Sequence, residues 1–220
     1  YQLFDGSKRI AIAIFENYKS VPCKIFRPIG FEIPDYTSYI DKNNALILSL
    51  RKNPKLQQLH ETLNAIFHKY SNKIDQVSRG NFYQGLKIIS IAGQRNTEQR
   101  FKIYGIGKYL QKNHTVLDIG SNCGFFSLYV SKFVKSVDGI EKDEDLVKIA
   151  NNTKKYLKIN NCTFYQSTFE QFKANKKYDL IMSFAVHRRV NYVLEEYINT
   201  LHNMLNKNGY LIIESQDIKG

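Results

Sequence analysis

The chain has 220 residues, 43% of them hydrophobic and 13% aromatic, which is enough to bury a core for one moderate domain with an appendage. It lacks both the ~20-residue apolar run that spans a bilayer and the pattern of a signal peptide, so we expect a cytoplasmic protein. The formal net charge of +12 allows an anionic partner such as RNA, yet the lysines are scattered and form no single basic cluster in the sequence.

The opening segment, residues 1–30, has the pattern of a turn followed by a helix and a strand. Asp5-Gly6-Ser7-Lys8-Arg9 forms the turn, the apolar Ile10–Ala13 begins the helix, and Val21–Phe26 carries the strand. This unit resembles part of the ParB/sulfiredoxin-like domains, except that Lys8 stands where they usually have histidine. The resemblance implies a phosphate-binding turn. The alternative is a helix and strand that only pack on the main domain.

Residues 31–94 are expected to form a mainly helical linker or extension. Apolar residues recur at helical spacing between Leu56 and Tyr70, which predicts one helix. The polar stretch Ser71–Gln84 is predicted to be a connection, and Leu86–Ile89 is either a short strand or the start of a helix.

Helical and strand patterns alternate over residues 95–220, as is typical of a parallel sheet with crossover helices. The expected strands are Thr115–Ile119, Ser136–Ile140, Thr163–Gln166, Tyr178–Phe184 and Tyr210–Ser215. The expected helices are Thr97–Gln111, Gly124–Phe133, Glu144–Lys158, Phe169–Phe172 and Val193–Leu205. We therefore predict an α/β fold, a Rossmann-like, doubly wound and mainly parallel sheet, with an N-terminal α+β or helical extension.

A glycine-containing turn follows the first of these strands. Asp118 ends the strand, and Gly120 and Gly124 let the backbone bend tightly and approach a ligand. The next strand ends at Glu141, where a carboxylate can accept hydrogen bonds from both ribose hydroxyls of a nucleoside. A dinucleotide dehydrogenase would need another glycine between Gly120 and Gly124, which counts against pyrophosphate binding.

Val116–Ser127, the strand-end Glu141, Tyr178–Ser183 and the helix-glycine-strand of Leu205–Glu214 together resemble the class I S-adenosylmethionine-dependent methyltransferases over about residues 97–218. The resemblance implies S-adenosylmethionine as the cofactor and S-adenosylhomocysteine as its product. It also implies an antiparallel strand pair after the fifth strand, so we expect a domain truncated there. The residues expected at the cofactor are Asp118, Gly120, Ser121, Asn122, Cys123, Gly124, Phe125, Glu141, Lys142, Ser167, Thr168, Phe169 and Ser183.

The segment after the fourth strand is the expected reaction edge, because ligands bind at the carboxyl ends of the strands in open α/β sheets. His187 titrates near neutrality and could take a proton from an acceptor hydroxyl, or it could only pack or orient the substrate. Further candidates for substrate contacts, each with ordinary surface charge or a helix start as the alternative, are Gln94, Arg95, Arg100, Arg188, Arg189 and Glu214.

We therefore predict an enzyme that methylates a small polar acceptor, such as a sugar, nucleotide-sugar or phosphorylated metabolite of surface glycan (polysaccharide) synthesis. A tRNA or rRNA methyltransferase and a non-catalytic cofactor-binding module are the alternatives. The three cysteines and five histidines show no ligand spacing, so we expect no metal. The oligomeric state stays open.

Overall fold

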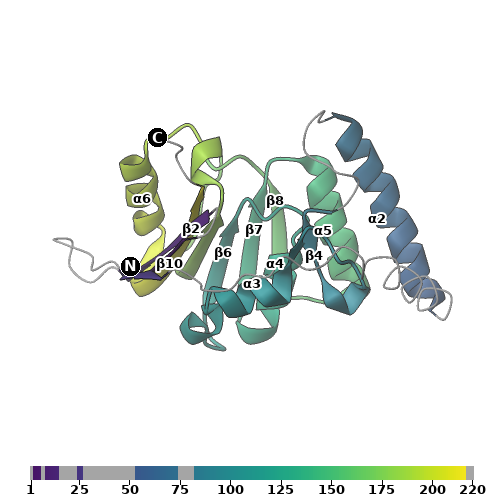
Figure 1. Cartoon of the computed structure of the whole chain (residues 1–220), viewed down its shortest axis with the longest axis horizontal. Helices are drawn as coiled ribbons and strands as arrows, with labels where there is room; N and C mark the ends of the chain where they lie inside the picture. The colour runs from purple at the N-terminus through teal and green to yellow at the C-terminus, as the bar shows by residue number, and fades with distance from the viewer. Residues whose placement is uncertain (1, 6–7, 15–23, 27–52, 74–81, 217–220) are drawn as a thin grey trace.

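The computed structural model of the chain describes residues 2–5, 8–14, 24–26, 53–73 and 82–216. In these residues one eight-stranded sheet has the order β3-β1-β2-β10-β9-β6-β7-β8, and a small sheet pairs β4 with β5. The helices lie on and beside the large sheet (Figure 1). Among the helices described, none is both long and apolar enough to cross a membrane.

The bounds of the elements follow. The strands are β1 (Gln2–Asp5), β2 (Lys8–Ile14), β3 (Lys24–Phe26), β4 (Gln84–Gly85), β5 (Arg95–Asn96), β6 (Thr115–Ile119), β7 (Ser136–Glu141), β8 (Cys162–Gln166), β9 (Tyr178–Phe184) and β10 (Leu205–Gln216). The α-helices are α2 (Pro54–Lys73), α3 (Thr97–Ile103), α4 (Phe125–Val130), α5 (Glu144–Leu157) and α6 (Leu194–Asn203). Short 3₁₀ turns are η1 (Lys87–Ile89), η2 (Ile106–Tyr109), η3 (Ser131–Phe133) and η4 (His187–Arg189).

Five neighbouring strands, β10, β9, β6, β7 and β8, are parallel to one another. The chain moves from β6 through β7 to β8 toward one edge, then returns to β9 and β10 on the other side of β6. The order reverses between β6 and β9, so a crevice is expected there at the carboxyl ends of the strands. The expected Rossmann-like, doubly wound α/β fold is confirmed.

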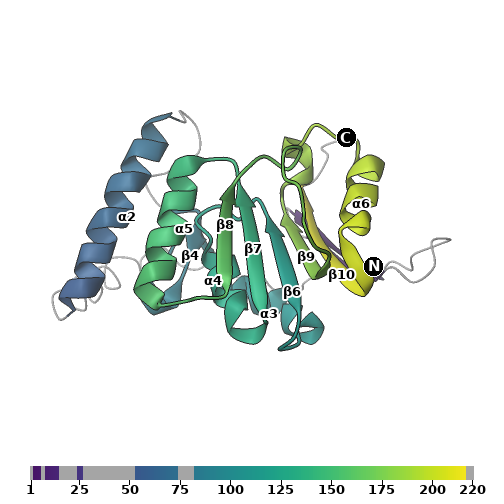
Figure 2. The same cartoon turned by 180° about the vertical axis from the view of Figure 1, so that it is seen from behind.

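Alternation along the strands divides the core between the two faces of the sheet. Val116 and Ile212 join a cluster with residues of α2, α4 and α5, whereas Leu117 and Leu211 join a cluster with residues of α6. Both views show α2 beside α5 at one end of the molecule and α6 beside β10 near the other (Figures 1 and 2).

The opening segment corrects one prediction, because β2 stands where we expected a helix. Isoleucine alternates with alanine from Ile10 to Ile14, and β-branched residues favour strands. The backbone of β2 pairs antiparallel with β10, and β1 pairs antiparallel with β2. A ParB/sulfiredoxin-like unit therefore has no support. Beside the fifth parallel strand, β10, the sheet continues with β2 and then β1, which come before it in the chain.

Two predicted helices also differ. The helix expected at Thr97–Gln111 stops at Ile103, because Gly105 takes a left-handed φ of 62° and a 3₁₀ turn follows. Its N-cap is Asn96, whose side chain accepts a hydrogen bond from the Gln99 amide. At Phe169–Phe172 there is only a turn, in which the Phe172 amide donates to the Thr168 carbonyl at 3.1 Å.

Candidate functional site

The loop between β6 and α4 has a backbone that few residues can adopt. Gly120, Asn122 and Gly124 have φ values of 67°, 55° and 70°. A Cβ atom on Gly124 would lie 2.6 Å from the Ala150 Cβ and 2.7 Å from the Phe164 ring, so glycine is required there. The Ser121 amide donates to the Ile140 carbonyl at 2.9 Å, which ties the loop to β7.

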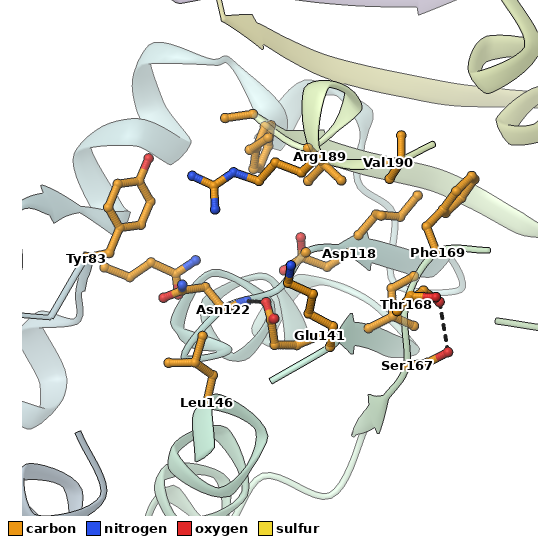
Figure 3. Close-up of a pocket in the computed structure, with 18 of the residues that line it drawn as sticks. Tyr83, Asp118, Asn122, Glu141, Leu146, Ser167, Thr168, Phe169, Arg189 and Val190 are labelled. Carbon is orange, nitrogen blue, oxygen red and sulfur yellow. Dashed lines mark hydrogen bonds between the residues drawn. The ribbon is translucent and has the colours of Figure 1, made fainter. Parts of the chain in front are cut away.

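This loop forms one wall of a cavity of about 330 Å³ at the switch point of the sheet (Figure 3). That volume is within the usual range for a small-molecule or cofactor site. The cavity is lined by Phe67, Tyr70, Tyr83, Gln84, Gln94, Arg100, Asp118, Ile119, Gly120, Asn122, Ile140, Glu141, Lys142, Leu146, Ser167, Thr168, Phe169, Glu170, Phe184, Ala185, Val186, Arg189 and Val190.

Glu141 is fixed at the end of β7 by two backbone amides. Its carboxylate accepts a hydrogen bond from Asn122 N at 3.0 Å (Figure 3). It accepts a second one from Asp143 N at 3.1 Å. Burial raises the pKa of this carboxyl, and the amide hydrogen bonds act in the opposite direction. A carboxylate held in this way still has lone pairs with which to accept hydroxyl hydrogens of a bound ligand.

Asp118, at the end of β6, is almost completely buried and accepts a hydrogen bond from the Ser127 hydroxyl. Desolvation raises the pKa of Asp118 to about 7, although the Ser127 hydrogen bond and the Arg100 charge lower it. The group is therefore part protonated near neutrality. It can donate a proton to a ligand or accept one.

Two side-chain oxygen atoms of the same loop have no hydrogen-bond partner within the described residues. Asn122 Oδ1 and Ser121 Oγ are buried without a hydrogen bond. A buried acceptor without a partner costs free energy unless a ligand or water satisfies it. Because Asn122 lines the cavity, its free oxygen is suited to the ammonium group of an amino acid moiety.

A second group of charges lies at the rim formed by α3 and the end of β10. Arg100 Nη2 lies 2.8 Å from Glu214 Oε2, and Arg100 Nε donates to the Tyr104 hydroxyl at 3.1 Å. Arg95 lies 3.7 Å from the same carboxylate. Arg100 is thus neutralised by a buried partner, although it lines the cavity.

Arg189 differs from Arg100 in its surroundings. It reaches across the cavity with its guanidinium group toward Tyr83 (Figure 3). In the part of the chain that the structure describes, no carboxylate forms an ion pair with it. Among the described residues, its guanidinium group therefore has no ion-pair partner at the rim that follows β9.

The structure brings most of the expected residues together. The cavity is lined by eight of the residues expected at the cofactor, Asp118, Gly120, Asn122, Glu141, Lys142, Ser167, Thr168 and Phe169, and by three of those expected at the substrate, Gln94, Arg100 and Arg189.

The other expected residues are absent from this lining. Cys123 and Phe125 are completely buried in the core, and Ser183 shares a hydrogen bond of 2.8 Å with the Tyr197 hydroxyl. Ser121 and Gly124 shape the loop from behind, whereas Arg95, Arg188 and Glu214 lie outside the wall of the cavity.

His187 lies in η4, between the end of β9 and α6, and is also absent from the lining. Its Nδ1 atom is buried and has no hydrogen-bond partner among the described residues. Desolvation, followed by the charge of Arg188, lowers the pKa of His187 below 6.5. The ring is therefore neutral at pH 7 and able to accept a proton.

Residues before the main domain were missed by the sequence reasoning. Phe67 and Tyr70 come from α2, and Tyr83 and Gln84 come from the segment that ends in β4. No local motif marks them, because their approach to the cavity depends on how α2 and β4 pack against the α/β domain.

A family model and several known proteins match the chain. A family model described as a methyltransferase domain matches residues 110–219, which is half of the 220-residue chain. An uncharacterized RNA methyltransferase of Mycoplasma mobile is 37% identical over 87 residues, covering 39% of this chain and 24% of the relative. A 23S rRNA (uracil(1939)-C(5))-methyltransferase of Aliivibrio salmonicida is 40% identical over 62 residues, covering 28% of this chain and 14% of the relative.

Solved structures include an S-adenosylmethionine-dependent methyltransferase from Thiobacillus denitrificans in complex with S-adenosylhomocysteine. It has 15% identity and a TM-score of 0.46, over 52% of this chain and 47% of that one. The chain spans about a quarter of the length of the Mycoplasma relative. Because the family model covers half of the chain, the chain belongs to the class I S-adenosylmethionine-dependent methyltransferases, and its cofactor is S-adenosylmethionine.

Proposed function

We propose that the chain is an enzyme that transfers the methyl group of S-adenosylmethionine to a small polar acceptor by direct displacement. One observation supports this above the others: the cavity at the switch point has a fixed carboxylate, Glu141, in one wall, and at its rim Arg189, which has no ion-pair partner among the described residues. The first suits a nucleoside and the second an anionic acceptor.

The residues of the cavity fit the cofactor. Glu141 would accept the ribose hydroxyls, and Asn122 Oδ1 would accept from the amino group of the methionine moiety. Ser167, Thr168 and Phe169 would flank the adenine, together with Leu146.

When bound, S-adenosylmethionine supplies an electrophilic methyl group attached to a positively charged sulfur. The bond from an acceptor oxygen or nitrogen to the methyl carbon forms as the carbon–sulfur bond breaks, and the electron pair of that bond stays on the sulfur of S-adenosylhomocysteine. Alignment contributes most of the rate. Here Val186 packs directly over Gly120, since a Cβ on Gly120 would lie 2.7 Å from Val186 Cγ2. The segment after β9, where we place the acceptor, therefore packs directly against the loop between β6 and α4, residues 120–124, which we call the cofactor loop.

The acceptor must also lose its proton, and we propose His187 as the base. Because its pKa is lowered, it is neutral at pH 7 and loses this capacity only on further acidification. His187→Ala is expected to reduce kcat roughly 100-fold on an identified acceptor, with affinity for S-adenosylhomocysteine unchanged. His68→Ala, on the exposed side of α2, is the matched control. Equal turnover in both variants would end the base assignment.

The acceptor is proposed to be a sugar, nucleotide-sugar or phosphorylated metabolite, of the kind used in surface glycan synthesis, in the cytoplasm. A guanidinium group binds carboxylate and phosphate well, and Arg189 has no ion-pair partner in the part of the chain that the structure describes. Transfer of a tritiated methyl group to phosphorylated sugars and nucleotide-sugars tests this, with unphosphorylated sugars as the matched control. Equal labelling of both sets would remove the anionic class.

A tRNA or rRNA methyltransferase is the second candidate. It is favoured by the net charge of +12 and by the two relatives whose names refer to RNA or rRNA. Affinity for tRNA and rRNA should then fall steeply between 50 and 200 mM salt, by about 1,000-fold if six phosphates are contacted. RNA that is neither bound at low salt nor labelled would exclude this candidate.

A non-catalytic module that binds the cofactor is the third candidate. Calorimetry with S-adenosylmethionine, combined with a methyl-release assay, separates it from the two enzymes. Binding without release on any acceptor favours the module, and absence of binding contradicts all three.

A further inference from the structure

Gln84 connects β4 to the cofactor loop through both ends of its side-chain amide. Its Nε2 donates to the Ser121 carbonyl at 3.2 Å, and its Oε1 accepts from the Phe125 amide at 3.0 Å. The side chain is almost fully buried and lines the cavity. The two hydrogen bonds therefore bracket the segment from Ser121 to Phe125.

The loop needs such support because its conformation is unfavourable. Three of its five positions from Gly120 to Gly124 have positive φ, and one of these is Asn122, a residue with a Cβ atom. A non-glycine residue in this region stores strain that the surrounding structure has to offset. Within the loop, the Gly124 amide donates to the Ser121 carbonyl at 2.9 Å, so this carbonyl accepts from both Gly124 and Gln84.

Gln84 also satisfies the first amide of α4. At the start of a helix the first amides have no partner within the helix, and Gly124, the N-cap of α4, has no side chain with which to cap it. The Phe125 amide is buried, so its bond to Gln84 Oε1 replaces the missing cap.

We infer that Gln84 is a positioning residue for the cofactor, so that the cofactor site of this chain includes a residue outside the part matched by the family model. Gln84 precedes the matched residues 110–219. It acts through the loop: it holds Gly120 and Asn122 in the conformation that faces the cavity, while Asn122 N donates to Glu141. The inference rests on the proposed use of this cavity by S-adenosylmethionine.

The test measures binding of S-adenosylhomocysteine to the full chain by calorimetry, which requires no acceptor. Gln84→Met keeps the length and volume of the side chain but removes both hydrogen bonds. We expect its dissociation constant to rise roughly tenfold to thirtyfold, since two hydrogen bonds are lost. Gln57→Ala is the matched control, because the side-chain amide of Gln57 is exposed and, in the residues described, donates only to the Glu61 carboxylate at 2.9 Å.

Gln84→Glu distinguishes positioning of the loop from a general loss of packing. A protonated carboxyl can reproduce both hydrogen bonds, whereas a carboxylate would face the Ser121 carbonyl without a hydrogen to donate. The affinity of Gln84→Glu relative to wild type should therefore recover as the pH falls from 8 to about 5.5. Asp118, Glu141, Arg100 and Arg189 line the same cavity, and their own titration changes affinity in both proteins. The ratio of the variant's dissociation constant to that of wild type, taken at each pH, cancels this shared change.

Hydrogen exchange at the Phe125 amide supplies an independent readout, which should be faster in Gln84→Met than in wild type. If wild type binds S-adenosylhomocysteine and Gln84→Met binds it equally well, the inference is overturned and the proposed function stands. The inference is also overturned by two results together: Gln84→Met has only a lower melting temperature, and the affinity of Gln84→Glu relative to wild type does not change with pH. A wild-type chain that fails to bind contradicts the proposed function first and the inference with it.

Discussion

Two carboxylates at the ends of neighbouring strands show how surroundings determine the chemistry of a single residue. Asp118 and Glu141 end β6 and β7, and both line the cavity. Asp118 is almost fully buried beside one hydroxyl donor, whereas Glu141 receives two backbone amides. The same carboxyl group therefore titrates near neutrality in Asp118 and is available as a fixed acceptor in Glu141.

The raised pKa of Asp118, about 7, predicts a pH-dependent stability. Because the pKa in the folded state exceeds that in the unfolded chain, the folded state holds the proton more tightly. The resulting stabilisation is present below about pH 4 and is lost as the pH rises through 7. Asp118→Asn needs no proton, so its unfolding free energy relative to wild type should rise by about 3 kcal/mol between pH 5 and pH 8. Urea unfolding at both pH values measures this, and a pH-independent difference would contradict it.

Glu141 is predicted to contribute directly to cofactor affinity. Glu141→Gln removes the charge and one acceptor, so the dissociation constant of S-adenosylhomocysteine should rise at least about tenfold. Glu144→Gln is the matched control, because Glu144 is exposed and pairs only with Lys148 at 2.7 Å in the residues described. Calorimetry on both variants decides, and equal affinities would remove Glu141 from the ribose site.

The turn from β6 to α4 shows how one element constrains another. Gly124 begins α4 in a left-handed conformation, and α5 and β8 approach it so closely that no Cβ fits. The geometry of this turn is therefore a joint property of three elements, although its glycines can be recognised in the sequence.

Gly105 and Gly124 have similar positive φ values, so replacing each of them distinguishes the cost of backbone strain from the cost of a steric clash. Gly105 has a φ of 62°, but the nearest side-chain atom to a Cβ placed there is 3.9 Å away. Gly105→Ala should cost about 1 kcal/mol of unfolding free energy from strain alone. Gly124→Ala adds the clash with Ala150 and Phe164 and should cost about 2 kcal/mol more. Chemical denaturation compares them, and equal losses would show that strain is the whole effect.

Contacts that connect distant parts of the molecule complete the site. Arg100 of α3 and Glu214 of β10 are 114 positions apart and form a buried ion pair of 2.8 Å. The guanidinium lies 5.3 to 5.6 Å from the ring centroids of Tyr104, Phe126 and Phe184, which add cation–π attraction. The pair joins the segment before β6 to the last parallel strand.

Breaking this pair is predicted to destabilise the whole domain. Glu214→Leu leaves the Arg100 charge buried and should cost about 3 to 5 kcal/mol. Combining it with Arg100→Met removes both charges and should recover much of that loss, because paired apolar replacements are often neutral. Denaturant unfolding of the two single variants and the double variant tests this. Losses that simply add would show that the two side chains are not coupled.

The parts of the fold that are specified locally could be predicted from sequence. The parallel strands and α5 follow from hydrophobic patterns confined to short segments, and the β6–α4 turn is marked by Gly120 and Gly124. Even so, the helix expected from Thr97 to Gln111 ends at Ile103, because Gly105 takes a left-handed conformation and a turn follows. The spacing of apolar residues does not show this turn.

The sequence by itself determined the α/β fold and the strand-loop-helix with Glu141, because strand ends, glycines and acidic residues lie at fixed short separations there. Only the tertiary structure decided that β2 extends the sheet beside β10, that Gln84 forms hydrogen bonds with the loop between β6 and α4, and that Arg100 is neutralised by Glu214. Each of these depends on groups far apart in the chain, whose pairing is set by packing and by the need to satisfy buried polar atoms. Local sequence patterns do not specify which of these distant groups will be in contact.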